Sequence, residues 1–318
     1  MRVEMKKLRP WLLLAVIIGV GILVSFLAAR PESLISTDHV ALIELSGTIS
    51  YEGSPISLFG SPLTPERVKE MVEYVSQDPS AKAVVLFINS PGGSAVASEE
   101  IYQALKELSE EKVVVSYIAE YGASGGYYIA LAGDVIMASP HSLTGSVGAI
   151  SILINYYELM ERLGVKAETF KSGSMKDIGN PWREMTEEER ELMQSMIDSI
   201  AKLFEQRVRE ERGDKVKDWG EVLSARPYTG TQALEAGLID RVGTLEEAIE
   251  LARELAGLPE DAPAEWVRPK APSLLEILLG GTARGHLKLS YEVLMMWPLP
   301  SLPEPYELVL ASCSEAKS

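Results

Sequence analysis

Short apolar runs that alternate with helical segments are the feature that most constrains the fold of this chain. Three of these runs, residues 83–88, 113–118 and 135–138, are almost continuously apolar. Runs of this kind are typical of strands that are buried on both faces of a parallel sheet. Each run is followed by a turn and then by a segment with helical character. The alternation predicts an α/β domain with a mainly parallel sheet.

Further elements are predicted from cap and stop signals. Pro65 stands at a favoured first helical position with Thr64 as its cap, and Gly213 ends a long helix with an acidic start and a basic end. We expect strands at 39–45 and near 167–170, and helices at 65–77, 94–109, 125–132, 155–163 and 186–212, with two shorter helices before Gly257.

The N-terminal part holds a long apolar stretch. Residues 11–29 are uncharged and would form a helix about 28 Å long, close to the roughly 30 Å of a bilayer core. Four basic residues before it favour a cytoplasmic N-terminus and place the rest outside the cell membrane. A cleaved signal peptide is the alternative, but Phe26 or Leu27 would then stand at the −3 position. The predicted parts are a basic segment at 1–10, a single-pass anchor at 11–29, a folded domain at 30–257 and a Pro-rich tail at 258–318.

Composition excludes several kinds of function. The net charge is −16, and so acidic a surface repels phosphate backbones, so nucleic acid is not an expected partner. Cys313 is the single cysteine, the three histidines are scattered, and neither glycine run matches a phosphate loop or a dinucleotide fingerprint. We therefore expect no metal and no cofactor.

One serine has the setting of a nucleophile turn. Ser124 lies between an apolar strand and an apolar helix, with small residues on both sides. Such neighbours leave a hydroxyl exposed beside free backbone N–H groups. The alternative is a helix cap, a role that serine fills routinely. Lys176 is the candidate base, with Lys166 and Lys171 as competitors and an ordinary solvated lysine as the alternative.

Glycines follow the ends of two of the predicted strands. Gly93 comes after the strand at 83–88, and Gly125 comes after the strand at 113–118. Ligands of parallel sheets gather at the carboxyl ends of the strands. If these two strands are neighbours, the N–H groups of Gly93 and Gly125 face one point, as a tetrahedral oxyanion requires. The pair Pro91-Gly92 is by itself also an ordinary turn signal.

Four motifs in order resemble signal peptide peptidase A, a family of membrane-anchored serine proteases whose fold is shared with Clp protease and crotonase. The resemblance runs from about residue 38 to residue 255. The motifs are Asn-Ser-Pro-Gly-Gly at 89–93, Gly-Ala-Ser-Gly-Gly-Tyr-Tyr at 122–128, Leu-Thr-Gly-Ser-Val-Gly at 143–148 and Lys-Ser-Gly-Ser-Met-Lys-Asp at 171–177. The resemblance implies repeated ββα units, with Ser124 as the nucleophile and Lys176, in place of Lys171, as the general base.

The resemblance also implies a substrate and an assembly. A protease of this family with a Ser-Lys dyad is expected to degrade remnant signal peptides, which are hydrophobic, after their release from preproteins. This chain has one set of motifs, and the short form of the family is expected to assemble as a homo-oligomeric ring.

A lysine acts as a base only when it is neutral. We therefore expect apolar surface to cover Lys176, the hydroxyl of Ser146 to hold its amino group, and activity to rise toward alkaline pH. His141 is expected to be a loop residue without a catalytic role.

Three other functions remain open. The stomatin-operon partner protease resembles the Asn-Ser-Pro-Gly-Gly start and uses a Ser-Lys pair, although its lysine is expected closer to the serine. An inactive membrane-tethered scaffold would keep the fold without hydrolysis. A crotonase-type acyl-CoA enzyme would share the oxyanion geometry without needing Lys176 or an anchor.

Overall fold

The structure is a computed structural model that describes residues 37–51, 62–267 and 294–296. The chain divides into two units, Met1–Thr37 and Asp38–Ser318, and the elements below belong to the second. The predicted anchor at 11–29 lies outside the described residues. Within them, no helix combines the length and the hydropathy that crossing a bilayer requires.

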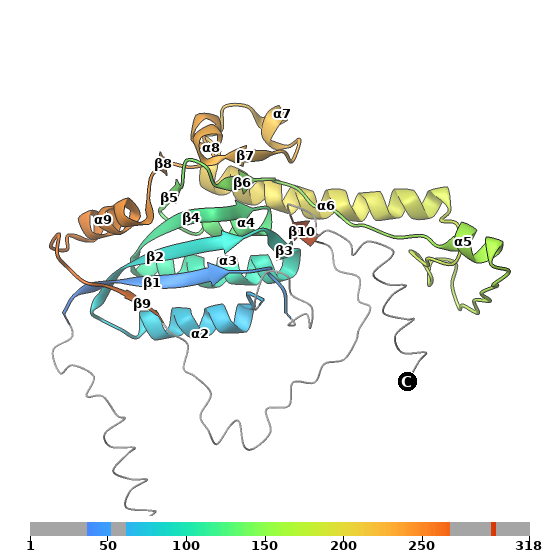
Figure 1. Cartoon of the computed structure of the whole chain (residues 1–318), viewed down its shortest axis with the longest axis horizontal. Helices are drawn as coiled ribbons and strands as arrows, with labels where there is room; N and C mark the ends of the chain where they lie inside the picture. Colours follow the sequence, from blue (N-terminus) through green and yellow to red (C-terminus); the bar gives the residue numbers. More distant parts are fainter. Residues whose placement is uncertain (1–36, 52–61, 268–293, 297–318) are drawn as a thin grey trace, which may run out of the picture. The chain divides into compact units, whose positions relative to one another are not determined.

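A mainly parallel sheet of eight strands forms the centre of the described part of the chain (Figure 1). Six strands follow the order β7-β6-β4-β2-β1-β9, while β5 pairs with β4 and β8 pairs with β5. Every pair in it is parallel except β6 with β7. The strands are β1 His39–Ser46, β2 Ala81–Ser90, β4 Val113–Ala123, β5 Val135–Ala138, β6 Leu143–Gly145, β7 Pro227–Thr229, β8 Arg241–Val242 and β9 Ala264–Trp266. A second, two-stranded sheet joins β3 Gly92–Ser94 to β10 Leu294–Met296.

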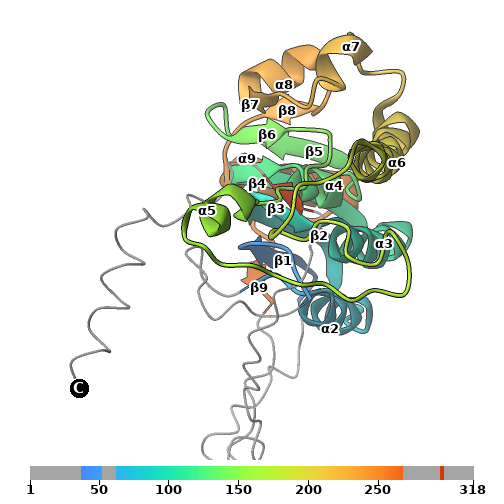
Figure 2. The same cartoon turned by 90° about the vertical axis from the view of Figure 1, so that its right-hand side faces the viewer.

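The central strands β1, β2 and β4 are apolar and buried along most of their length, because helices cover both faces of the sheet. In β1, Val40 and Leu42 belong to a cluster with α9, whereas Ala41 and Ile43 belong to the larger cluster with α2, α3 and α4. This is the alternation that a strand imposes on successive side chains. Figure 2 shows the layers nearly along the strands. The helices are α2 Pro65–Ser76, α3 Ala95–Glu111, α4 Gly125–Ala130, α5 Tyr157–Arg162, α6 Glu187–Arg212, α7 Trp219–Val222, α8 Gly230–Ala236 and α9 Leu245–Ala256.

The helix limits follow the cap signals of the sequence. Thr64 accepts a hydrogen bond from the N–H of Arg67 at the start of α2. Thr186 and Glu189 form a reciprocal capping box at the start of α6. These interactions satisfy N–H groups that a helix leaves unpaired in its first turn, which is why the starts were predictable.

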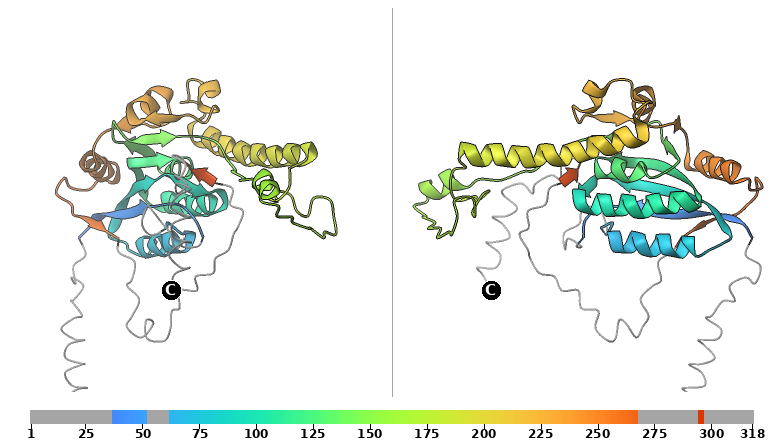
Figure 3. Two further views of the ribbon diagram at one scale, coloured as in Figure 1. Left: turned by 45° about the vertical axis from the view of Figure 1, so that its right-hand side comes forward. Right: turned by 180° about the vertical axis from the view of Figure 1, so that it is seen from behind.

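One predicted strand is wrong. Residues 167–170 form no strand, and the side chain of Phe170 is 93% exposed. They belong to a segment that we call the arm, residues 150–186, which contains α5. Figures 1 and 3 show α5 beyond the end of the sheet, near the N-terminal part of α6. A strand needs a neighbouring strand for its backbone hydrogen bonds, and no strand of the described sheets pairs with this segment.

Two short strands lie in the region predicted as a Pro-rich tail, residues 258–318. Strand β9 extends the sheet beside β1, with Val40 opposite Ala264, and β10 pairs with β3. Both strands have only three residues, too few to show a periodic pattern in the sequence. They are recognised only by their pairing with β1 and β3.

A buried ion pair joins Arg212, the last residue of α6, to Asp240, the residue before β8. The side chain of Arg212 is 3% exposed and donates to both carboxylate oxygens of Asp240 at 2.8 Å. It also donates to the carbonyl of Gly237 at 3.0 and 3.2 Å. Burial raises the pKa of Asp240, but the N–H of Ile136, Lys215 and Arg212 outweigh burial and lower it.

The Arg212→Ala variant is expected to lose about 3 kcal/mol of stability, because it leaves the Asp240 carboxylate partly buried without its main partner. Lys215→Ala is the matched control: it removes a half-exposed partner of the same carboxylate and is expected to cost under about 1 kcal/mol. Urea unfolding at pH 7 measures both. Because the pKa of Asp240 is lowered on folding, the stabilisation is present above about pH 4 and is lost as pH falls below it. Equal effects of the two variants would contradict this assignment.

Candidate active site

Ser124 lies at the junction of β4 and α4 in a conformation that serine rarely adopts. Its φ is 54° and its ψ is −118°, its side chain is buried, and its hydroxyl makes no capping hydrogen bond to α4. Its N–H donates to the carbonyl of Gly145 at 2.8 Å. A left-handed non-glycine residue costs on the order of 1–3 kcal/mol and is concentrated at functional sites. The helix-cap alternative is therefore not supported.

Backbone strain gathers around this junction. Three non-glycine residues of the described chain have positive φ, namely Ser124, Ser146 and Ala225. Ser146 follows β6, which pairs with β4 so that Ala123 lies opposite Gly145. The N–H of Ser146 donates to the carbonyl of Arg226, directly after Ala225, at 3.1 Å. Ser124 and the other two residues with positive φ thus lie on chain segments that are joined to one another by backbone hydrogen bonds.

The structure brings Gly93 and Gly125 together, as the sequence predicted for neighbouring strands. Strands β2 and β4 are adjacent, with Ser90 opposite Gly122. A Cβ atom on Gly125 would lie 3.2 Å from the nitrogen of Gly93 and 2.5 Å from the hydroxyl of Ser98. Only glycine permits so close an approach. As the first residue of α4, Gly125 also has an N–H without a partner inside the helix.

The direction of the Gly93 N–H follows from its neighbours in β3. Ile49 donates to the carbonyl of Gly92 at 2.9 Å and accepts from the N–H of Ser94 at 2.8 Å. Because successive N–H groups of a strand alternate in direction, the N–H and carbonyl of Gly93 face the other edge of β3. That edge pairs with β10, and Met295 lies opposite Gly93 in an antiparallel register. The edge beside the serine can therefore bind an extended polypeptide.

Two residues that the sequence had marked only as part of a turn signal hold this geometry. The side-chain oxygen of Asn89 accepts from the N–H of Tyr121 at 3.1 Å, which joins the ends of β2 and β4. The hydroxyl of Ser90 accepts from the N–H of Gly92 at 3.2 Å. In the sequence, the motif Asn-Ser-Pro-Gly-Gly at 89–93 was the only indication of these two roles. It does not reveal that Asn89 contacts the end of β4.

Lys176 does not lie at the β4–α4 junction that holds Ser124. It belongs to the arm, its side chain is exposed, and no hydrogen bond of that side chain occurs among the described residues. The expectation that apolar surface covers Lys176 and that Ser146 holds its amino group is therefore not met within one chain. The reason is the placement of the arm, which leaves the sheet after β6 and returns along α6 (Figure 3). The competitor Lys171 instead contacts Asp177 at 2.6 Å.

A network of charges fixes the loop that carries Lys176. Arg183 donates to the two carboxylate oxygens of Asp177 at 2.8 and 2.9 Å and to Glu189 at 2.8 Å. Hydrogen bonds from Arg183, and then from Lys171, hold the pKa of Asp177 well below its usual range. Arg183 also lowers the pKa of Glu189 to about 2. The residue next to Lys176 is thereby tied to the capping box of α6.

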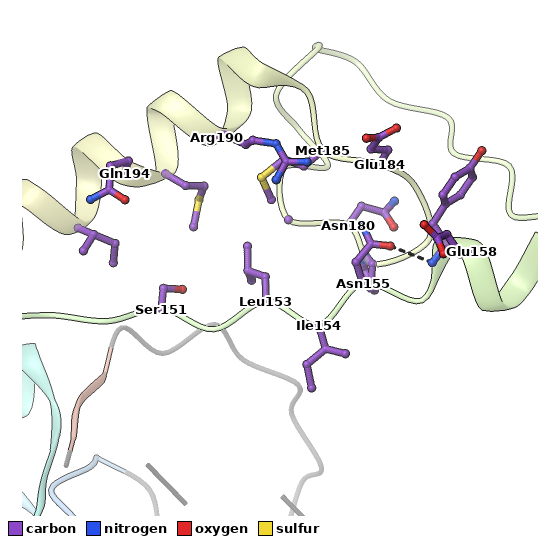
Figure 4. A pocket seen from close by; sticks show the side chains of 15 residues that line it. Ser151, Leu153, Ile154, Asn155, Glu158, Asn180, Glu184, Met185, Arg190 and Gln194 are labelled. Carbon is purple, nitrogen blue, oxygen red and sulfur yellow. Dashed lines mark hydrogen bonds between the residues drawn. The ribbon is translucent and has the colours of Figure 1, made fainter. Parts of the chain in front are cut away.

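A hollow of about 630 Å³ lies on the arm and not beside Ser124. Figure 4 shows Leu153 and Met185 among the side chains around it. None of the predicted site residues lines it. It separates the outgoing chain of the arm from the first turns of α6.

His141 is exposed in the turn between β5 and β6, in the loop predicted for it. Within the described residues, no group of three His, Cys, Asp or Glu side chains is arranged to hold a metal ion.

Comparison with known proteins identifies the family. A model of peptidase family S49 matches residues 106–259, and a model of Clp protease matches residues 62–144. The predicted protease MJ0651 of Methanocaldococcus jannaschii is 34% identical over 263 residues, 80% of this chain and 83% of that protein. The chain belongs to peptidase family S49. Several relatives are named as proteases, among them those of Methanocaldococcus jannaschii and Haemophilus influenzae, so the family indicates hydrolysis of peptide bonds.

Other S49 relatives are longer than this chain. The chloroplastic serine protease SPPA of Arabidopsis thaliana is 34% identical over 76% of this chain and 36% of its own length. Protease 4 of Haemophilus influenzae is 27% identical over 87% of this chain and 44% of its own length. The chain thus spans less than half of these two proteins. Among solved structures, a membrane-bound stomatin-specific protease has a TM-score of 0.43 at 16% identity, covering 74% of this chain and 100% of its own.

Replacement of Arg183 by methionine is expected to release the loop of this S49 protein that carries Lys176. Cleavage by thermolysin within residues 165–186, mapped by mass spectrometry, should become several-fold faster. Arg162→Met is the control, because Arg162 is 80% exposed and contacts Glu158 only at 3.9 Å. Unchanged cleavage in Arg183→Met would show that the network does not hold the loop.

Proposed function

We propose that this chain is a membrane-anchored serine endopeptidase in which Ser124 is the nucleophile and Lys176 is the general base. The observation that carries the proposal is the junction itself. A strained, uncapped serine stands beside two approaching glycines at a strand edge that pairs with an extended chain. Membership of family S49 supports the same reaction.

Each part of the junction has a role in the proposed reaction. The hydroxyl of Ser124 attacks the scissile carbonyl, and Lys176 takes the proton and passes it to the leaving amine. The N–H groups of Gly93 and Gly125 donate to the oxyanion that forms on the carbonyl oxygen. Water then hydrolyses the acyl-enzyme, with Lys176 again as the base. The edge of β3 holds the substrate in an extended form through main-chain hydrogen bonds.

We further propose that the substrates are hydrophobic peptides such as remnant signal peptides. Binding through the main chain demands no particular side chain, which suits substrates related by apolar character alone. A relative from Enterococcus faecium, 29% identical, is named a predicted signal peptide peptidase. The apolar run at 11–29 supports a single-pass anchor in the cell membrane, with the catalytic domain outside the cytoplasm.

The proposed dyad requires a second copy of the chain. Ser124 lies in the sheet domain, whereas the exposed Lys176 lies on the arm. The arm exposes large apolar side chains, among them Leu163 at 68% and Phe170 at 93%. Burial of this surface against a neighbouring copy would cover Lys176 and bring it to another copy's serine. A closed ring follows when each copy repeats the same contact.

Two of the other functions predict different results. A scaffold of the same fold would not react with a fluorophosphonate, which labels an activated serine. A stomatin-directed protease would also be labelled, but it would cleave a stomatin-derived peptide in preference to signal peptides.

Ser124→Ala and Lys176→Ala are each expected to lower hydrolysis of a hydrophobic peptide by at least about 10³-fold, because each removes one half of a cooperating pair. The full-length chain in detergent is assayed from pH 7 to 10, where the wild-type rate should rise as the base loses its proton. His141→Ala should keep most of the activity. A rate that rises near pH 6.5 and loses this rise in His141→Ala would refute the Ser-Lys dyad.

Mixing the two inactive variants tests the shared site. If Ser124 and Lys176 of different copies form the dyad, equal amounts of Ser124→Ala and Lys176→Ala recover activity at about a quarter of the sites through random assembly. Each variant incubated alone is the control. No recovery after subunit exchange, shown by mass spectrometry of the mixed assemblies, would place both residues in one chain.

A further inference from the structure

One carboxylate joins three helices, of which one begins at the candidate nucleophile. Glu99 of α3 accepts a hydrogen bond from the hydroxyl of Tyr128 in α4 and, at 3.0 Å, another from Arg207 in α6. Gln103, one turn further along α3, donates to the same carboxylate at 2.6 Å. Burial raises the pKa of Glu99, but the hydrogen bonds from these three donors outweigh burial and lower it. The ionised carboxylate therefore holds α4 and α6 at one point.

Aromatic packing surrounds this carboxylate. The ring of Tyr128 lies 4.9 Å from that of Phe204 in α6 and meets that of Tyr102 in α3 edge-on at 5.6 Å, measured between ring centres. The guanidinium of Arg207 lies over the Tyr102 ring, 4.4 Å from its centre. All three aromatic residues are buried. We call these five residues, with Glu99, the three-helix cluster.

The three-helix cluster is connected to the nucleophile through α4. Tyr128 lies one turn after Ser124, and its N–H donates to the carbonyl of Ser124 at 2.9 Å. α4 has only six residues, and Gly125 is the first of them. The contacts of Tyr128 therefore hold the short helix that starts at the serine.

On α6, the same cluster contains the last buried contact before the arm. Between Glu189 and Phe204 no residue of α6 is buried, and Figure 1 shows this part of the helix extending beyond the end of the sheet. Arg183 and Asp177 tie the loop of Lys176 to Glu189, at the far end of α6. The direction of α6 at the cluster therefore decides where the arm carries this lysine.

A small tilt of α6 has a large effect at the arm. The 18 residues from Phe204 back to Thr186 span about 27 Å at 1.5 Å per residue, so a tilt of about 10° at the cluster moves the start of α6 by about 5 Å. A general base must come within about 3 Å of the proton that it takes. A tilt of this size would thus remove a lysine on the arm from the reach of a serine.

We propose that Glu99 is a positioning residue, which holds α6 against the nucleophile helix and thereby sets where the arm presents Lys176 to the Ser124 of another copy. The inference rests on the proposed function in that it takes Lys176 as a base supplied by the arm. Glu99 touches neither the lysine nor the peptide-binding edge of β3 in this arrangement. Its loss should therefore lower kcat and leave KM nearly unchanged.

The Glu99→Gln variant of the full-length chain in detergent tests the proposal. Its amide replaces one acceptor oxygen by an NH₂ group, which only donates, so that Tyr128 and Arg207 no longer both have an acceptor. Hydrolysis of a hydrophobic peptide should show kcat lowered about ten-fold and KM within about two-fold of the wild-type value. Glu210→Gln is the matched control, because it removes a carboxylate that contacts the same Arg207 at 2.6 Å from within α6. Unchanged kcat in Glu99→Gln, or an equal loss in both variants, would overturn the proposal.

Mixed assemblies show through which element Glu99 acts. In a mixture of Ser124→Ala and Lys176→Ala chains, the first chain supplies the lysine and the second supplies the serine. Glu99→Gln in the lysine-supplying chain should lower the recovered activity about ten-fold, whereas in the serine-supplying chain it should leave this activity unchanged. A loss that follows the serine-supplying chain, or that is the same in both, would show a role other than placing the arm.

A distance measurement does not depend on catalysis. Spin labels at the exposed positions Glu107→Cys in α3 and Glu188→Cys in α6, in a Cys313→Ser background diluted with unlabelled chains, report the direction of α6. Glu99→Gln should broaden the distance distribution, and Glu210→Gln should not. A broader distribution without hydrolysis by any chain, the wild type included, would refute the protease and leave Glu99 as the residue that orients α6. An unchanged distribution with normal hydrolysis by the wild type would overturn the positioning role and leave the protease intact.

Discussion

The close approach between β3 and the first turn of α4 is the constraint on which the site depends. The two chain segments meet because β2 and β4 are neighbouring parallel strands whose ends carry glycines. Asn89 holds the two strand ends together through the N–H of Tyr121. A side chain at Gly125 would push β3 away from the serine, and with it the N–H of Gly93. The sheet and the site therefore share one set of contacts.

Much of the sheet was accessible from the sequence. The apolar runs at 83–88 and 113–118 predicted β2 and β4. The cap signal at Thr64 and the acidic start of the helix at 186–212 predicted two helix starts, because these features reflect local physics. The approach of Gly93 to Gly125 also followed, since it requires only that the two strands be adjacent. The strand predicted near 167–170 was wrong because a short segment becomes a strand only where a partner strand is available.

The position of Lys176 could not be derived in the same way. Its motif resembles the one that carries a general base. However, its loop belongs to the arm, and the sequence of the arm has no periodic pattern from which its path in space could be predicted. What the sequence did contain were the charges that stabilise the loop. Asp177, Arg183 and Glu189 form a compact network in a region with little apolar core. Polar contacts here replace the hydrophobic packing that positions Ser124, so the two halves of the proposed dyad are held by different kinds of interaction.

The backbone at residue 124 has a thermodynamic consequence. A φ of 54° is easily adopted by glycine and costs free energy in any other residue. Folding alone would therefore favour a glycine at this position, because glycine has no Cβ atom to strain the backbone. The serine opposes the preference of the fold, as residues often do where activity and stability conflict. The nucleophilic role proposed for its hydroxyl would account for its presence.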